Sequence, residues 1–277
     1  MVLPAEKGNQ IWRVIDILNW GEDYFKSKGF ESPKQEIEWL LCDLLNYKRI
    51  DLYVQFEQPI HRPQLKQLKE WIKRRIGREP LQYITGKTEF YGYKFIITPD
   101  VLIPRPETER VVDVALHKIG NIKNPKVLDV GSGSGCIAIA IGAEKKDALI
   151  LSVDISEGAI RKAKKNAVLN ELSNIEFQVM DILKDIPDGP FDLLVSNPPY
   201  IPEKEMRETM PEVHQYEPKI ALTDERDGLT FYRRFAKIGK SLIKPGGSMV
   251  LEVGLGEHPA KAVDIFQSAG YSQLELI

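Results

Sequence analysis

The tetrapeptide Asn197-Pro198-Pro199-Tyr200 combines residue types that can activate a weak nitrogen nucleophile. An amide or aromatic amine nitrogen attacks poorly because its lone pair is delocalised into the neighbouring π-system. Acceptors for both N–H groups favour a pyramidal, more reactive nitrogen; Asn197 offers a side-chain carbonyl and Pro198 a backbone carbonyl. Tyr200 adds a flat face on which a planar amide or base can stack. The segment therefore predicts a substrate pocket, with Asn197, Pro198 and Tyr200 as its candidate catalytic residues.

A second candidate is the glycine-rich segment Gly131-Ser132-Gly133-Ser134-Gly135, which follows an apolar run. Glycines let the backbone turn tightly and approach a ligand where a Cβ atom would clash. The spacing is G-x-G-x-G, with Cys136 at the position where a dinucleotide fingerprint has its third glycine. A glycine-rich turn alone is also typical of an ordinary loop between a strand and a helix, so its neighbours decide the interpretation.

Two acidic residues lie where a nucleoside would need them. Asp154 closes the strand that follows the glycine turn, about 20 residues on, the usual place of an acid that accepts both ribose hydroxyls. Asp181 closes the next strand, where it could meet an adenine amino group. Together with the glycine turn they predict a nucleoside-binding crevice at the carboxyl ends of the strands. The chain has no G-x-x-x-x-G-K-[ST] loop, so ATP is not expected.

The elements that must position these residues alternate between strand and helix from about residue 124 onward. This alternation favours a parallel sheet with helices on both faces, a doubly wound, Rossmann-like α/β domain. Apolar runs predict strands at 126–130, 149–153, 175–179, 191–195 and 248–253.

The first third of the chain has helical periodicity. Apolar stripes predict three amphipathic helices, the second beginning at Pro33 and the third running from about Pro63 to Gly77. Residues 83–97 are rich in aromatic and β-branched side chains and predict a β-hairpin. We therefore expect a helical domain over 1–80, a hairpin linker over 81–106 and a catalytic domain over 107–277.

Composition excludes several classes of protein. The 277 residues include 38 Lys and Arg against 40 Asp and Glu, without the basic excess typical of a nucleic-acid binder, so DNA is not expected as a partner. Two cysteines, Cys42 and Cys136, rule out a disulfide scaffold and a four-cysteine zinc site, and fit a cytoplasmic protein. No apolar run approaches the roughly 18–20 residues that span a bilayer, so no membrane contact is expected.

The sheet pattern, the glycine turn, Asp154 and the tetrapeptide resemble the S-adenosylmethionine-dependent amino methyltransferases. Adenine-N6 DNA methyltransferases and protein glutamine methyltransferases share the tetrapeptide, and the flanking segments distinguish between them. Residues 78–86 (REPLQYITG), 89–92 (EFYG) and 101–109 (VLIPRPETE) closely resemble the PrmC/HemK family. That family methylates the glutamine of the Gly-Gly-Gln motif in peptide chain release factors. The resemblance covers nearly the whole chain.

By this resemblance S-adenosyl-L-methionine is the cofactor, and no metal is implied. The glycine turn contacts its methionine part, Asp154 holds the ribose, and Asp181 and Ile182 flank the adenine. Ile182 occupies a place that is often aromatic in relatives, which removes stacking. Asn197 contacts both cofactor and substrate amide, and Pro198, Pro199 and Tyr200 complete the glutamine pocket. The implied cofactor-binding residues are Gly131, Ser132, Gly133, Ser134, Gly135, Asp154, Asp181, Ile182 and Asn197.

The same resemblance implies a release factor as the partner, with the helical domain helping to dock it and N5-methylglutamine and S-adenosylhomocysteine as products. We expect a monomer.

For Arg105 and Glu107, in the motif at 101–109, a structural role in the linker is at least as well supported as substrate contact. Relatives usually end with a further pair of strands after the helix at 259–269, whereas residues 271–277 suffice for one. We expect this to affect stability more than chemistry.

Two other functions remain open at this stage. A DNA adenine methyltransferase would use the tetrapeptide on a flipped base, but the balanced charge and the lack of a second, basic target-reading domain oppose it. A non-catalytic protein that binds the cofactor and regulates translation is the other possibility. An amide-activating pocket at Asn197–Tyr200 opposes that function, because a protein that only binds has no use for it.

Overall fold

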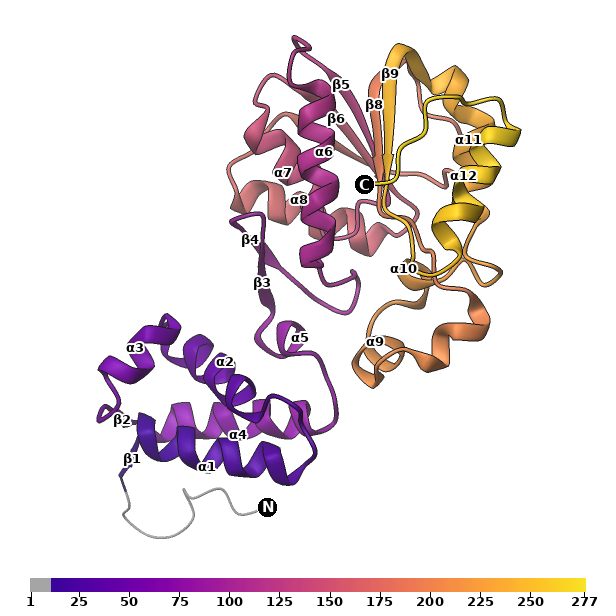
Figure 1. The fold of residues 1–277 in the computed structure, drawn as a ribbon. Helices are drawn as coiled ribbons and strands as arrows, with labels where there is room; N and C mark the ends of the chain where they lie inside the picture. The colour runs from indigo at the N-terminus through magenta and orange to yellow at the C-terminus, as the bar shows by residue number, and fades with distance from the viewer. Residues whose placement is uncertain (1–10) are drawn as a thin grey trace. The chain divides into compact units, whose positions relative to one another are not determined.

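A computed structural model describes residues 11–277 and divides the chain after Gly86 into two compact units (Figure 1). The first unit is helical and ends with the short helix α5. Its elements are β1 (Trp12–Arg13), α1 (Val14–Ser27), α2 (Pro33–Leu45), α3 (Arg49–Val54), β2 (Pro59–Ile60), α4 (Arg62–Ile76) and α5 (Leu81–Thr85). The three predicted helices correspond to α1, α2 and α4. Helix α3 was not predicted, because its six residues are too few to show helical periodicity.

The apolar stripes of these helices form one core. Ile17 of α1, Leu40 of α2 and Leu68 of α4 are fully buried in it. Beside this core the guanidinium of Arg75 makes two hydrogen bonds, of 2.6 and 2.8 Å, to the carboxylate of Glu36. Arg75 lies in the last turn of α4 beside Lys73 and Arg74, yet only 7% of this residue is exposed. The charge therefore joins α4 to α2 instead of facing solvent.

The second unit contains a five-stranded parallel sheet in the order β7-β6-β5-β8-β9, which confirms the predicted doubly wound α/β class. Its strands are β5 (Lys126–Val130), β6 (Leu149–Asp154), β7 (Ile175–Val179), β8 (Phe191–Ser196) and β9 (Ile243–Leu251). The order reverses direction between β5 and β8, so the crevice expected at such a switch point lies beyond the carboxyl ends of these two strands.

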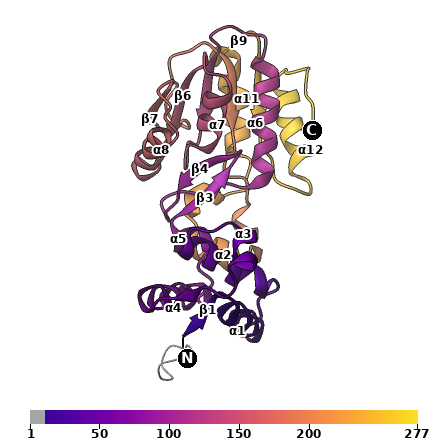
Figure 2. The ribbon, with the colours of Figure 1, turned by 90° about the vertical axis from the view of Figure 1, so that its left-hand side faces the viewer.

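Helices cover both faces of the sheet. Helices α6, α7 and α8 lie on one side and α11 and α12 on the other (Figures 1 and 2). Their bounds are α6 (Glu109–Ile119), α7 (Cys136–Glu144), α8 (Glu157–Leu169), α11 (Thr230–Leu242) and α12 (His258–Ser268). The segment between β8 and α11 contains a short 3-10 helix and the helices α9 (Pro211–Tyr216) and α10 (Lys219–Leu222).

The hairpin β3 (Lys87–Phe90) and β4 (Tyr93–Ile96) belongs to the second unit. It is shorter than the sequence predicts, because Leu81–Thr85 forms α5, and Gly86 ends that helix at a φ of 78°. Strand β9 begins five residues before the predicted start, at Ile243 instead of 248. Residues 271–277 form neither helix nor strand, so the further strand that they could have supplied is not formed.

No helix in the described part, residues 11–277, is both long and apolar enough to cross a membrane.

Candidate active site

The glycine turn and the tetrapeptide lie side by side at one edge of the sheet. They follow the neighbouring strands β5 and β8, in which Val130 pairs with Ser196, so Gly131 and Asn197 leave the sheet at the same level. A Cβ atom built on Gly131 would lie 3.8 Å from the backbone oxygen of Asn197. Two motifs that are more than 60 residues apart in sequence thus meet at the switch point.

All three glycines of the turn have a positive φ: 83° at Gly131, 52° at Gly133 and 84° at Gly135. Only glycine adopts these angles without strain. At Gly135 there is a second requirement, because a Cβ atom would lie 3.1 Å from the Cβ of Ala163 in α8. The turn is therefore built by backbone geometry, and its residues Ser132 and Ser134 are buried.

Asp154 ends β6 and holds the glycine turn in place. One carboxylate oxygen accepts the backbone N–H of Gly133 at 2.9 Å, and the other accepts that of Ser156 at 2.8 Å. Burial raises the pKa of this carboxyl, although the two N–H donors act in the opposite direction. The side chain predicted to hold a ribose thus lies at the crevice with its two oxygens already oriented.

The two residues predicted to flank an adenine lie differently. Asp181 follows β7, where it accepts the backbone N–H of Leu183 and forms a 2.9 Å ion pair with Lys184. Ile182 is only 4% exposed and belongs to the core cluster that includes Val130 and Val153. Its backbone oxygen accepts the guanidinium of Arg234 at 2.7 Å. Contact of either side chain with an adenine remains a prediction.

A buried polar chain that the sequence analysis missed supports the glycine turn from within the sheet. The hydroxyl of Ser152 donates to Asp129 at 2.6 Å and lies 2.5 Å from the hydroxyl of Ser132. Burial raises the pKa of Asp129 to about 7. The available signal was an acid inside the apolar run Val127–Val130, since buried charges are rare without a partner.

Asn166 in α8 was also missed, and it joins the hairpin to the glycine turn. Its side-chain amine donates to the backbone oxygens of Ser134 at 2.9 Å and Ile96 at 3.2 Å, while its oxygen accepts the N–H of Ile96 at 2.8 Å. The residue is fully buried. An asparagine on the buried face of a predicted helix was the only sequence signal.

Hydrogen bonds orient the side chains of the tetrapeptide. The amine of Asn197 donates to the hydroxyl of Thr108 at 3.1 Å, and this hydroxyl donates to Glu252 at 2.7 Å. The other oxygen of Glu252 accepts the hydroxyl of Tyr200 at 3.4 Å. Burial raises the pKa of Glu252 and raises that of Tyr200 to about 12. Neither Thr108 nor Glu252 was predicted as a site residue; Thr108 lies within the family motif at 101–109.

Tyr200 lines a pocket of about 670 Å³ together with Glu252, Arg105 and Glu107. The guanidinium of Arg105 is ion-paired with Glu217, which is buried and also accepts the N–H of Ile103. Arg105 thus has the structural partner that the sequence analysis allowed for, and it also faces the pocket beside Tyr200.

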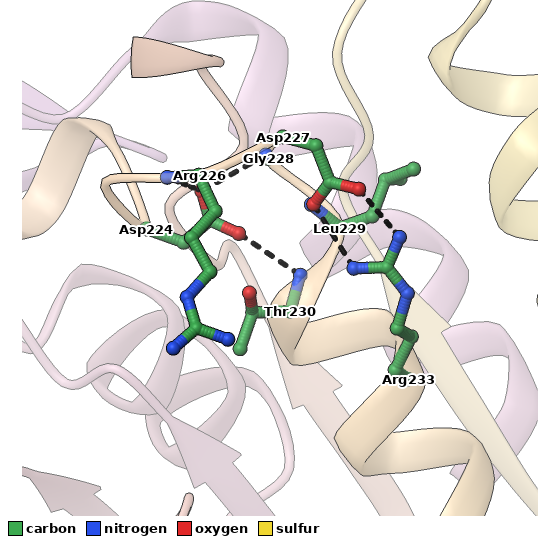
Figure 3. Close-up of polar contacts among 7 residues, drawn as sticks. All are labelled: Asp224, Arg226, Asp227, Gly228, Leu229, Thr230 and Arg233. Carbon is green, nitrogen blue, oxygen red and sulfur yellow. Dashed lines mark hydrogen bonds and ion pairs between the residues drawn. The ribbon is translucent and has the colours of Figure 1, made fainter.

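The loop Asp224–Thr230 forms a wall against the tetrapeptide, with Gly228 next to Tyr200. Figure 3 shows the polar contacts of this loop. The carboxylate of Asp224 accepts the backbone N–H groups of Arg226, Gly228 and Thr230, at 2.9, 2.9 and 3.0 Å. Asp227 accepts the N–H of Leu229 and pairs with Arg233 in the first turn of α11 (Figure 3). The loop is therefore closed on its own backbone by acidic side chains.

This wall touches the tetrapeptide through Gly228. A Cβ atom built there would lie 2.2 Å from the backbone oxygen of Tyr200 and 2.7 Å from Cε1 of His258. Just after the tetrapeptide, the backbone N–H groups of Ile201 and Glu203 donate to the backbone oxygens of Leu222 and Arg226, each at 3.0 Å. Only glycine fits against Tyr200 at this position.

Comparison with known proteins supports the interpretation of both units. The family model "PrmC N-terminal domain" matches residues 16–86, and "Methyltransferase small domain" matches 110–215. A release factor glutamine methyltransferase of Geobacter sulfurreducens is 40% identical over 90% of this chain and 86% of its own. Those of Fusobacterium nucleatum and Chlorobaculum tepidum are 36% and 37% identical, over 99% and 91% of this chain and 78% and 87% of theirs. The chain belongs to the release factor glutamine methyltransferase family.

Membership of this family confirms the resemblance that the segments at 78–86, 89–92 and 101–109 carried. Within residues 11–277 no group of three or more His, Cys, Asp or Glu side chains could hold a metal ion.

We expect Gly228→Ala to destabilise the second unit more than Gly246→Ala. Both glycines have a positive φ, 76° and 81°, so both variants carry similar backbone strain. Only at Gly228 does the new methyl group meet other atoms, since Gly246 has nothing within 4 Å. Overpacking typically costs about 1–3 kcal/mol, so the free energy of unfolding should fall by at least about 1 kcal/mol more. Equal losses in calorimetry would contradict the proposed contact with Tyr200.

We expect Asp129→Asn to reduce the pH dependence of stability. The folded-state pKa of about 7 exceeds the unfolded value, so Asp129 favours the folded state at low pH and this contribution is lost as the pH rises from about 4 to about 7. The slope is at most about 1.4 kcal/mol per pH unit.

The stability of the second unit is followed by amide hydrogen exchange in β5. Tryptophan fluorescence is not suitable, because all four tryptophans lie in residues 12–71 and do not report on this unit. The exposed Asp188, as Asp188→Asn, is the control. An unchanged pH slope in Asp129→Asn would contradict the assignment.

Proposed function

We propose that this chain transfers a methyl group from S-adenosyl-L-methionine to the side-chain amide nitrogen of the glutamine in the Gly-Gly-Gln motif of peptide chain release factors. The products are N5-methylglutamine and S-adenosylhomocysteine. The observation that carries the proposal is the close approach of Gly131 to Asn197. A Cβ atom built on Gly131 would lie 3.8 Å from the backbone oxygen of Asn197. This approach brings a nucleoside-type crevice and an amide-holding tetrapeptide to the same edge of one sheet. Family membership supports the activity and the substrate.

The residues at the crevice fit the methyl donor. A bulky ligand can approach the backbone of Gly131 and Gly133, where a built Cβ would meet no atom closer than 3.8 Å. Asp154 presents a carboxylate at the end of β6, and Asp181 presents another after β7. We assign the methionine part to the turn Gly131–Gly135, the ribose to Asp154 and the adenine to Asp181 and Ile182. When bound, S-adenosylmethionine supplies an electrophilic methyl group on a sulfonium.

Asn197 and Pro198 hold the nitrogen that receives the methyl group. Each offers a carbonyl oxygen to one N–H of the glutamine amide, which weakens the delocalisation of the nitrogen lone pair. Tyr200 and Pro199 border the amide plane and keep water from it. No side chain needs to act as a strong base, because the nitrogen loses its proton readily once it is alkylated. The contribution of these residues is therefore orientation and electrostatic stabilisation.

The partner is a release factor, and we infer that residues 1–80, taken as one docking domain, help to bind it, with 81–106 as linker and 107–277 as catalytic domain. We further propose that the enzyme acts as a monomer in the cytoplasm and does not act on DNA. The balanced charge, 38 basic against 40 acidic residues, supports the last point, since DNA-binding proteins need a basic surface.

One assay separates this function from its rivals. The protein is incubated with methyl-labelled S-adenosylmethionine and either a release factor or unmethylated duplex DNA. We expect mass spectrometry to find a methyl group on the Gly-Gly-Gln glutamine and none on adenine. Label on DNA adenine alone would identify a DNA methyltransferase, and binding of the cofactor without any transfer would identify a regulatory binding protein.

Asn197→Ala should lower kcat by at least ~10²-fold, the scale of losing one hydrogen-bonding group that acts in the transition state. Thermal unfolding followed by circular dichroism checks that the variant still folds. The matched control is Asn121→Ala, an exposed asparagine in the turn after α6, which should leave kcat unchanged. Near-normal turnover of Asn197→Ala would remove this side chain from the mechanism.

A further inference from the structure

We propose that Thr108 and Glu252 are positioning residues that determine which end of the Asn197 side-chain amide faces the glutamine substrate. This inference rests on the proposed function and adds two residues that the tetrapeptide does not contain. An asparagine amide has an oxygen and an amine of nearly the same shape, and only the oxygen can accept a substrate N–H. Something in the protein must therefore select one of the two orientations.

The direction of a hydrogen-bond chain makes this selection. An ionised carboxylate such as Glu252 only accepts hydrogen bonds, so the hydroxyl of Thr108, 2.7 Å away, must donate its single proton to it. The hydroxyl then has only lone pairs for its other neighbour, Asn197 at 3.1 Å. Asn197 must meet those lone pairs with its amine. Its oxygen is thereby turned away from Thr108 and kept free for the substrate.

The hydrogen-bond chain from Asn197 through Thr108 to Glu252 joins three separate segments of the protein. Thr108 ends the 3-10 helix Pro106–Thr108 and is 2% exposed. Glu252 follows β9, where its backbone N–H donates to Ser196 at 2.9 Å and its backbone oxygen accepts the hydroxyl of Tyr232 at 2.7 Å. Ser196 is the residue before Asn197. The carboxylate is thus anchored to the same strand end as the side chain that it orients.

The same carboxylate also fixes the stacking surface. Its second oxygen accepts the hydroxyl of Tyr200 at 3.4 Å. Glu252 therefore controls both the acceptor and the aromatic face of the amide pocket. A glutamine at position 252 would break the directionality, because its side chain can donate as well as accept and would leave both orientations of Asn197 satisfied.

Protonation of Glu252 would have a similar effect, since a protonated carboxyl can donate to Thr108. Burial already raises the pKa of this group. The charged and titratable groups that act on it or feel it are Glu107, Tyr200, Tyr232 and Cys136, while Arg105 acts on Tyr200. Hydrogen bonds to Thr108, Tyr200 and Asn197 lower the pKa of Glu252. Because Glu107 raises the pKa further, kcat should fall on the acid side as Glu252 takes up a proton.

The kinetic test compares Thr108→Val, Thr108→Ser and Glu252→Gln in the full chain, with release factor and S-adenosylmethionine. We expect Thr108→Val and Glu252→Gln to lower kcat about 10-fold or more while the KM for the cofactor changes little, since an orienting group acts on the reacting geometry. Thr108→Ser, which keeps the hydroxyl, should recover most of the rate. The acid limb of kcat should be absent in Glu252→Gln. The control is Thr88→Val in β3.

A direct measurement is independent of turnover. In ¹⁵N spectra the side-chain amine of Asn197, identified by its loss in Asn197→Ala, should exchange slowly in the wild type and in Thr108→Ser and rapidly in Thr108→Val. A wild type that methylates no release factor would overturn the proposed function, whereas the amine signal would still test the positioning. Wild-type kcat in Thr108→Val, or equal kcat values in Thr108→Ser and Thr108→Val, would overturn the positioning role. If Thr108→Val does not bind S-adenosylhomocysteine, Glu252→Gln and Thr108→Ser decide alone.

Discussion

The parallel pairing of β5 with β8 is the constraint on which the rest of this site depends. In a parallel sheet all carboxyl ends lie at one edge, and here the strand order changes direction between these two strands. A shift of the β5–β8 register by one residue would turn the side chains at the strand ends to the opposite face and separate Gly131 from Asn197. The hydrogen bonds of Asp154, Asp129 and Asn166 all act around this junction. The strand pairing sets the level at which the loops begin, and these hydrogen bonds hold the loops in place.

Apolar runs were sufficient to predict much of the sheet, because its central strands β5 and β8 are buried on both faces and are nearly continuously apolar. The predicted bounds of β5 and β7 agree with the structure, and α2 begins at the predicted Pro33. Helix α5 was not predicted, since Leu81–Thr85 has residues typical of a strand and its helical state depends on Pro80 and Gly86. Helix α3 was missed for a different reason, its length.

The site was predictable where a motif is contiguous and not where it is assembled from distant residues. The tetrapeptide, the glycine turn and Asp154 stand out because their types and spacing carry information in one stretch of sequence. Thr108, Glu252 and Asn166 do not, since each acts through hydrogen bonds to residues more than 30 positions away. Their partners become known only when the chain is folded. Arg75 shows the same limit: Glu36, which accepts its guanidinium hydrogen bonds, is 39 residues away.

The loop Asp224–Thr230 sets one wall of the amide pocket from within its own segment. Asp224 closes this loop with three backbone N–H groups from its own segment, and the loop then supports Tyr200 through Gly228. None of these contacts involves the glycine turn or the acids that follow β6 and β7. This wall of the amide pocket is therefore held independently of the loops that line the nucleoside crevice.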